Sequence, residues 1–224
     1  MYTCKRLGYP RVALGFSPRF FSSQRSKGKT IVVDNPYTGA VHCEVPLSPL
    51  SESLKLLTSC SNAQKQYWNE TQKSLESRQA MVKKYIKGLK ELEKEFATEI
   101  TESMGKPLRQ SLGEVNTMLQ RAEAVLEMST SALADEVLVP MPNINRTIRK
   151  EPVGTVFVIA PWNYPLLCSI NSIIPALLAG NSILFKMSSR TPRIADLFAK
   201  AAQKSDFPKN LITPIHCDHE VTTA

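Results

Sequence analysis

The clearest pattern in the chain is a pair of short apolar runs with a longer apolar run between them. Gly154 to Ile159 is apolar and rich in β-branched side chains, which is typical of a strand buried on both faces. Leu166 to Ala179 is apolar on most of its circumference and long enough for a buried helix. Gly180-Asn181 would end that helix, and Ser182 to Lys186 is a second apolar run that ends in a cation. The pattern predicts one βαβ unit with parallel strands and a right-handed crossover.

The first part of the chain predicts a hairpin followed by helices. Ile31 to Val33 and Ala40 to Val45 are candidate strands, separated by an Asn-Pro-Tyr-Thr-Gly turn. Ser51 is placed to cap a first helix. Apolar residues then recur at spacings of three and four from Ser74 to Met104, which predicts a single second helix. A further helix is predicted from Ser111 to Ala134.

A second hairpin is predicted between these helices and the βαβ unit. Val137 to Met141 and Asn145 to Arg149 are two candidate strands joined around Pro142-Asn143. An unpaired hairpin edge is a liability in a monomer. Strands and helices together predict an α/β protein.

Composition and charge narrow the class of protein. Of the 224 residues, 42% are hydrophobic and 21% are charged, which is ordinary for a globular protein. No apolar run approaches the roughly 20 residues of a membrane-spanning helix, so no membrane span is expected. The formal net charge of +8 is uneven, because seven basic and no acidic residues lie in residues 1–33. The rest of the chain is close to neutral, and without a basic stripe no nucleic-acid binding is expected.

The first 29 residues have the composition of a mitochondrial transit peptide. They are basic and free of acids, contain several serines, and alternate basic with bulky apolar side chains. Arg19-Phe20-Phe21-Ser22 resembles a matrix-processing site, with cleavage expected after Phe21. We therefore expect a presequence without fixed structure and a mitochondrial matrix location. The alternative is a basic tail without a targeting function.

Three motifs in the last third of the chain carry a family resemblance. PWNYP at 161–165, PALLAGN at 175–181 and FKMSSRTP at 185–192 match, in order and spacing, the patterns of the aldehyde dehydrogenase superfamily. GKPL at 105–108, NPYTG at 35–39 and DFP at 206–208 also fall where a family member has them. The resemblance covers roughly residues 31–224.

The resemblance implies a partial aldehyde-dehydrogenase-like fold of the α/β class. Residues 30–224 would form a truncated NAD(P)-binding domain, with an incomplete Rossmann-type parallel sheet and helices N-terminal to it. The hairpin at about 137–149 would be the bridging element that helps to build a subunit interface in the family. The corner at Lys106 is expected to be structural, as it is in the family.

The resemblance also assigns site residues. Asn163 matches the asparagine whose side-chain amide helps to form the oxyanion hole; the alternative is a turn asparagine that bonds its own backbone. Lys186 matches the lysine that contacts the adenosine ribose, and a cation at the carboxyl end of a parallel strand suits that role. The alternative for Lys186 is a solvated lysine at a strand end. The other cofactor-binding positions that the resemblance implies are Ile159, Pro161, Trp162 and Ser189, with Trp162 either a wall of the site or ordinary packing.

The cofactor implied by the resemblance is NAD or NADP. Ser189 stands where many NAD-preferring members carry a glutamate, which would bind the ribose 2′-hydroxyl and repel a 2′-phosphate. Serine does neither, and Arg190 and Arg193 are close in sequence. NADP is therefore expected to be tolerated.

The match ends before the family's nucleophilic cysteine, water-activating glutamate and second glycine-rich cofactor segment. We therefore expect a truncated member that is inactive alone, and the five cysteines are not expected to replace the nucleophile. Cys168, near the start of the buried helix, is expected to be a buried structural thiol. His216-Cys217-Asp218-His219 does not fit a closed tetrahedral site, so no metal centre is expected.

Two functions stay open at this point. The first is an oxidoreductase that uses a nicotinamide nucleotide to oxidise an aldehyde, of unidentified structure, to a carboxylic acid. The second is a non-catalytic module that binds nucleotide or pairs with a related full-length chain. A homo- or hetero-oligomer is compatible with both.

Overall fold

A three-stranded parallel sheet in the order β5-β6-β7 carries the predicted βαβ unit. The computed structural model describes residues 29–71, 74–139 and 141–224, so the predicted presequence lies, apart from Lys29, outside the described residues. The elements of this region are β5 (Thr155–Ala160), α5 (Pro165–Leu178), β6 (Ser182–Met187), α6 (Arg193–Ala202), β7 (Ile212–Pro214) and α7 (His219–Thr223). The predicted strand, helix and parallel strand are confirmed.

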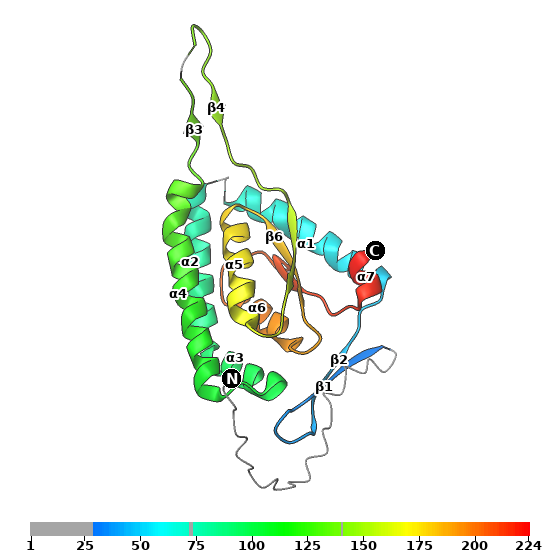
Figure 1. The fold of residues 1–224 in the computed structure, drawn as a ribbon. Helices are drawn as coiled ribbons and strands as arrows, with labels where there is room; N and C mark the ends of the chain where they lie inside the picture. The colour runs from blue at the N-terminus through cyan, green and yellow to red at the C-terminus, as the bar shows by residue number, and fades with distance from the viewer. Residues whose placement is uncertain (1–28, 72–73, 140) are drawn as a thin grey trace, which may run out of the picture.

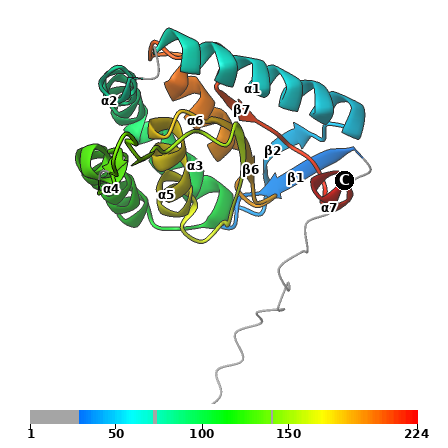
Figure 2. The same cartoon turned by 90° about the horizontal axis from the view of Figure 1, so that it is seen from above.

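Helices cover the two faces of this sheet unequally. α5 and α6 pack on one face, where Val158, Phe185 and Phe198 join the main core. On the other face α1 packs against β6 and contacts both β5 and β7, so that Cys60 packs against Leu184. Figures 1 and 2 show the sheet between these two helical layers.

The prediction that the first strand is buried on both faces is wrong. β5 is an edge strand whose outer face α1 covers only in part, so Phe157 is 40% exposed and Ile159 is 58% exposed. By contrast, every residue of β6, the central strand, is buried. A continuous apolar run predicts burial on both faces. Within the described residues, only one of the two faces of β5 is buried.

The N-terminal hairpin is confirmed, and the helices after it differ from the prediction in two places. β1 (Thr30–Asp34) pairs antiparallel with β2 (Val41–Pro46). α1 (Leu50–Glu70) begins after Pro49 rather than at a Ser51 cap. The predicted helix from Ser74 to Met104 is two helices, α2 (Leu75–Glu91) and α3 (Glu93–Met104).

Leu92 explains why the break between α2 and α3 is invisible in the hydrophobic pattern. Its backbone leaves the helical region, at φ −97° and ψ 12°, yet its side chain is buried in the main core. The apolar stripe therefore continues across the break with its spacing unchanged. Gly105 then ends α3 in the left-handed conformation at φ 79°, as the glycine-proline signal indicates.

The second hairpin projects away from the rest of the protein (Figure 1). It follows α4 (Leu108–Ala132) and consists of β3 (Glu136–Val137) paired antiparallel with β4 (Thr147–Ile148). Both strands are shorter than predicted, and their apolar side chains are exposed. None of the described helices is both long and apolar enough to cross a bilayer.

The carboxyl end of α5 is held by side chains from the first two helices. Tyr67 donates its hydroxyl to the Leu177 carbonyl at 3.2 Å, and Arg78 donates to the Leu178 carbonyl at 2.7 Å. These bonds satisfy carbonyls that a helix end leaves without intrahelical partners. Gly180 follows at φ 91°, with its α-carbon against the Trp68 ring.

Candidate functional site

The turn between β5 and α5 presents Asn163 on the surface. Pro165 occupies the first turn of α5, where its missing N–H costs nothing. The Asn163 side-chain oxygen accepts a hydrogen bond from its neighbour's backbone, the Tyr164 N–H, at 3.1 Å. Among the described residues the amide nitrogen of Asn163 has no hydrogen-bond acceptor, and the residue is exposed. The side-chain oxygen therefore orders the turn, as the turn alternative predicts, and the side-chain nitrogen is left as an exposed donor group.

A buried carboxylate from another helix caps α5. Tyr164 stands at the N-cap position without a side-chain cap bond. Instead, Glu114 of α4 accepts the Leu166 N–H at 2.9 Å and is within 3.5 Å of the Leu167 N–H. A carboxylate at a helix N-terminus satisfies free N–H groups and interacts favourably with the helix dipole.

Lys106 and Glu114 together hold the turn that carries Asn163, and we call this pair of side chains the clamp. Lys106 forms an ion pair with Glu114, whose side chain is almost fully buried. The same ammonium group donates to the Asn163 backbone carbonyl at 3.1 Å and lies 4.4 Å from the centre of the Tyr164 ring. The structural role expected for Lys106 is thus extended to direct contact with the turn that carries Asn163.

Lys186 is buried without an ionic partner. It is 6% exposed, which removes the solvated strand-end alternative. Its one hydrogen bond, to the carbonyl of the next residue, is long at 3.5 Å. Within the part of the chain that the structure describes, no carboxylate lies within ion-pair distance of it. A buried ammonium group is costly without compensating oxygen atoms, so the site fits a ligand that brings them.

Strand register places Asn163 and Lys186 at the same end of the sheet. Ile159 is the registered neighbour of Lys186, and the Ser188 N–H donates to the Ala160 carbonyl at 3.0 Å. The turn that carries Asn163 begins directly after Ala160. This is the carboxyl end of a parallel sheet, where open α/β folds bind ligands.

Apolar surface lies beside these polar groups. Of the other predicted cofactor positions, Ile159, Pro161 and Trp162 are exposed, and Tyr164 beside them is exposed as well. Their apolar surfaces can pack on a flat aromatic ligand. Two surface hollows, of about 510 Å³ and 480 Å³, are lined by other residues.

The arginines near Ser189 are engaged elsewhere. Ser189 is half-buried and brings no carboxylate. Arg190 forms an ion pair with Asp34 and donates to its carbonyl at 3.2 Å, while Arg193 lies 3.6 Å from Glu99. A 2′-phosphate at Ser189 would therefore meet no repelling carboxylate there, and the two guanidinium groups already have acidic partners.

The prediction that Cys168 is a buried thiol is wrong. Cys168 is exposed on α5, because the residues that face the core from this turn are Leu166, Ser169 and Ile170. The other described cysteines, Cys43, Cys60 and Cys217, are also free thiols. Burial, and to a lesser degree the charge of Glu99, raises the pKa of Cys43 to about 11.

Sequence reasoning missed Glu114. A signal for it exists: Glu114 stands next to Val115 and near Ser111 on the buried side of α4, where an acid needs a partner. What the sequence does not show is the partner, since the α5 N-terminus lies 52 positions away from Glu114.

Comparison with known proteins defines the family. The family model described as the aldehyde dehydrogenase family matches residues 22–224. Malonate-semialdehyde dehydrogenase 1 of Bacillus thuringiensis subsp. konkukian is 31% identical over 196 residues, which cover 86% of this chain and 39% of that protein. This chain belongs to the aldehyde dehydrogenase family. It spans about 39% of the length of the curated relatives that it matches.

Solved structures agree with the fold. The crystal structure of succinate-semialdehyde dehydrogenase from Burkholderia pseudomallei superposes with a TM-score of 0.77 at 25% identity, over 86% of this chain and 39% of that chain. Glyceraldehyde-3-phosphate dehydrogenase GapN from Methanocaldococcus jannaschii, complexed with NADP, gives a TM-score of 0.75 at 25% identity, over 88% and 43%. The partial α/β fold expected from the motifs is therefore confirmed.

Proposed function

We propose that this chain takes part in the NAD(P)-dependent oxidation of an aldehyde to a carboxylic acid, supplying an oxyanion donor and a ribose contact. One observation carries the proposal. A buried ammonium group, with no carboxylate partner among the described residues, lies at the carboxyl end of β6, beside the turn that exposes the Asn163 amide. Membership of the aldehyde dehydrogenase family supports this chemistry.

Each residue has a defined task in this account. The Asn163 amide donates to the substrate oxygen as negative charge develops on it, without itself titrating. Lys186 donates to hydroxyl or phosphate oxygens of the nucleotide. When bound, a nicotinamide nucleotide supplies the hydride acceptor. The nucleophile and the base that releases the acyl group are assigned to none of the described residues.

The proposal has two finer parts. Ser189 allows NADP as well as NAD, because it offers no carboxylate against a 2′-phosphate. The basic, acid-free residues 1–29 direct the protein to the mitochondrial matrix.

A non-catalytic module is the second candidate, and exposed apolar surface favours it. Val137, Val139 and Ile148 of the projecting hairpin are exposed, as are Phe157 and Ile159 of β5. Such surface is typical of contact with another chain. In this case the chain binds nucleotide, or a related chain, without turning over an aldehyde.

Calorimetric titration of the full chain with NADP⁺ and with NAD⁺ tests the nucleotide site. We expect saturable binding that weakens at least tenfold, about 1.4 kcal/mol, in Lys186→Met. The matched control is Lys209→Met, at an exposed lysine, with unchanged affinity. Binding that is absent, or equal in wild type and Lys186→Met, would refute the site. In an assay with an aldehyde panel, turnover by the chain would refute the non-catalytic module, whereas binding without turnover is expected both of the module and of a chain whose nucleophile comes from elsewhere.

A further inference from the structure

A bulge in the first hairpin re-aims a histidine. In the β1–β2 pairing, Val33 is registered with Cys43 and Asp34 with Val41, so His42 is the extra residue that faces no partner. Neighbouring residues of a regular strand point to opposite faces. A bulge breaks that alternation and redirects a side chain, and bulges occur often next to functional sites. Here it lets His42 and Cys43 share one side.

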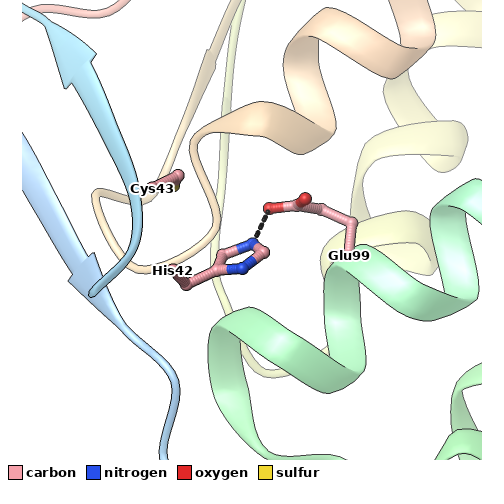
Figure 3. Close-up of side chains that lie close together, drawn as sticks. All are labelled: His42, Cys43 and Glu99. Carbon is pink, nitrogen blue, oxygen red and sulfur yellow. Dashed lines mark hydrogen bonds and ion pairs between the residues drawn. The ribbon is translucent and has the colours of Figure 1, made fainter. Parts of the chain in front are cut away.

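The shared side faces Glu99 on α3 (Figure 3). His42 Nε2 lies 3.1 Å from Glu99 Oε1, and the side chains of both residues are more than nine-tenths buried. One ligand atom from each of His42, Cys43 and Glu99 lies within 4.8 Å of the other two. In a tetrahedral zinc site the ligand atoms are roughly 3–4 Å apart, given bonds of about 2.0–2.3 Å. The three donors are therefore close to the spacing that one small ion requires.

The residues around these three donor atoms also favour a metal site. Glu102 Oε2 lies 3.4 Å from His42 Nδ1, so this carboxylate can accept the Nδ1 proton and leave Nε2 free to bind a metal. A surface groove of about 480 Å³ between α3 and α6 is lined by Glu99 and Glu102, so it reaches the cluster from its Glu99 side. Arg193 lies 3.6 Å from Glu99 Oε2 and also beside the Cys43 thiol, so its guanidinium group must turn away toward the groove when a cation binds.

We propose that His42 Nε2, Cys43 Sγ and Glu99 Oε1 bind a divalent ion of the zinc class, with water as the fourth ligand. On binding, the Cys43 thiol releases its proton to solvent and holds the metal as a thiolate. The oxidation state of the metal does not change. The ion would join β2 to α3, and thus tie the hairpin to the helical layer. The site is independent of the nucleotide site proposed above.

The competing account of this cluster is an ordinary ion pair, in which a protonated His42 bridges Glu99 and Glu102. Cobalt(II) distinguishes the two accounts, because it replaces zinc and gives a visible spectrum. After treatment of the full chain with EDTA and its removal, we expect one Co²⁺ per chain, with the absorption of a four-coordinate site and a thiolate charge-transfer band. No binding at micromolar Co²⁺ would overturn the proposal.

Variants locate the ion. Cys43→Ser should abolish the charge-transfer band, and Glu102→Gln should weaken binding by about 10–100-fold, as removal of a supporting carboxylate does. Cys217→Ser and Cys4→Ser should leave the charge-transfer band intact. If the band is lost in one of these two variants and kept in Cys43→Ser, the assignment of Cys43 as the ligand is refuted. Thermal unfolding guards against misfolded variants: Zn²⁺ should raise the Tm of wild type saturably and leave that of His42→Gln unchanged. A rise of equal size in His42→Gln would count against the site.

Discussion

Glu114 on α4 accepts the backbone N–H of Leu166 at 2.9 Å and so caps the helix that follows the Asn163 turn. The same carboxylate pairs with Lys106, which in turn holds the Asn163 carbonyl. One buried acid thus fixes both the start of α5 and the turn before it. The position of Asn163, the proposed oxyanion donor, therefore depends on a residue of another helix.

Removing that charge should cost stability. In Glu114→Gln the partly buried Lys106 loses its ionic partner, and breaking one side of a fully buried ion pair costs at most about 3–5 kcal/mol. We expect the free energy of unfolding, measured by urea titration, to fall by up to that amount. Glu123→Gln, at an exposed position of the same helix, should change it by less than about 0.5 kcal/mol. Equal effects of the two changes would disprove the clamp.

Lys186 should behave in the opposite way. Its ammonium group is buried with one long hydrogen bond, so its replacement by methionine removes a desolvated charge and keeps the volume. We expect Lys186→Met to leave the free energy of unfolding unchanged or higher while nucleotide affinity falls. A large loss of stability would show that the ammonium group serves the fold rather than a ligand.

Gly180 tests the packing at the other end of α5. Its backbone is at φ 91°, and an added Cβ would lie 2.5 Å from the Trp68 ring. Left-handed backbone costs about 1–2 kcal/mol and overpacking about 1–3 kcal/mol, so Gly180→Ala should destabilise by about 2–5 kcal/mol. Gly113→Ala in α4 meets open space and should instead stabilise by about 0.5–1 kcal/mol. Thermal unfolding tests both predictions, because the Tm should fall in Gly180→Ala and rise in Gly113→Ala.

Ser189 tests the choice between the two nucleotides. In Ser189→Glu a carboxylate would face the 2′-phosphate, so NADP⁺ affinity should fall at least tenfold and NAD⁺ affinity should not. Ser131→Glu, an equal charge change at an exposed position of α4, should leave both unchanged. A parallel loss of NAD⁺ and NADP⁺ affinity in Ser189→Glu would contradict the role given to this residue.

The ion pair between Asp34 and Arg190 should make the free energy of unfolding depend on pH. The hydrogen bond from Arg190 lowers the pKa of the Asp34 carboxyl below its ordinary value. Its stabilising contribution is therefore complete above about pH 4, the unfolded value, and is lost as pH falls through the lower folded value. Because Asp34 is half exposed, we expect less than about 1 kcal/mol. The stability difference between wild type and Asp34→Asn should shrink below about pH 4; a difference that grows there would be contrary evidence.

The sequence predicts local elements well where one pattern controls them. The βαβ unit follows from two short apolar runs, a long one and the Gly180-Asn181 stop, all of which act locally. The break at Leu92 does not follow, because the residue keeps its place in the apolar stripe while its backbone turns. The open face of β5 does not follow either, since exposure of Ile159 depends on where α1 lies.

The site shows the same division between local and distant causes. Asn163 and Lys186 are identified by short motifs around them, and both lie at the predicted end of the sheet. The contacts of Glu114 with Leu166 and of His42 with Glu99 span 52 and 57 positions respectively. Exposure of Cys168 depends on the rotation of α5 about its axis, and a helix that is apolar on most sides leaves that rotation undetermined.

A crystal structure of the full chain with NADP⁺ tests the central claim most directly. The account predicts the adenosine ribose at the carboxyl ends of β5 and β6, with Lys186 Nζ about 3 Å from a ribose or phosphate oxygen. It also predicts the Asn163 amide on the same side of the sheet as the nicotinamide. A nucleotide bound elsewhere, or Lys186 still without an oxygen ligand beside it, would contradict the account.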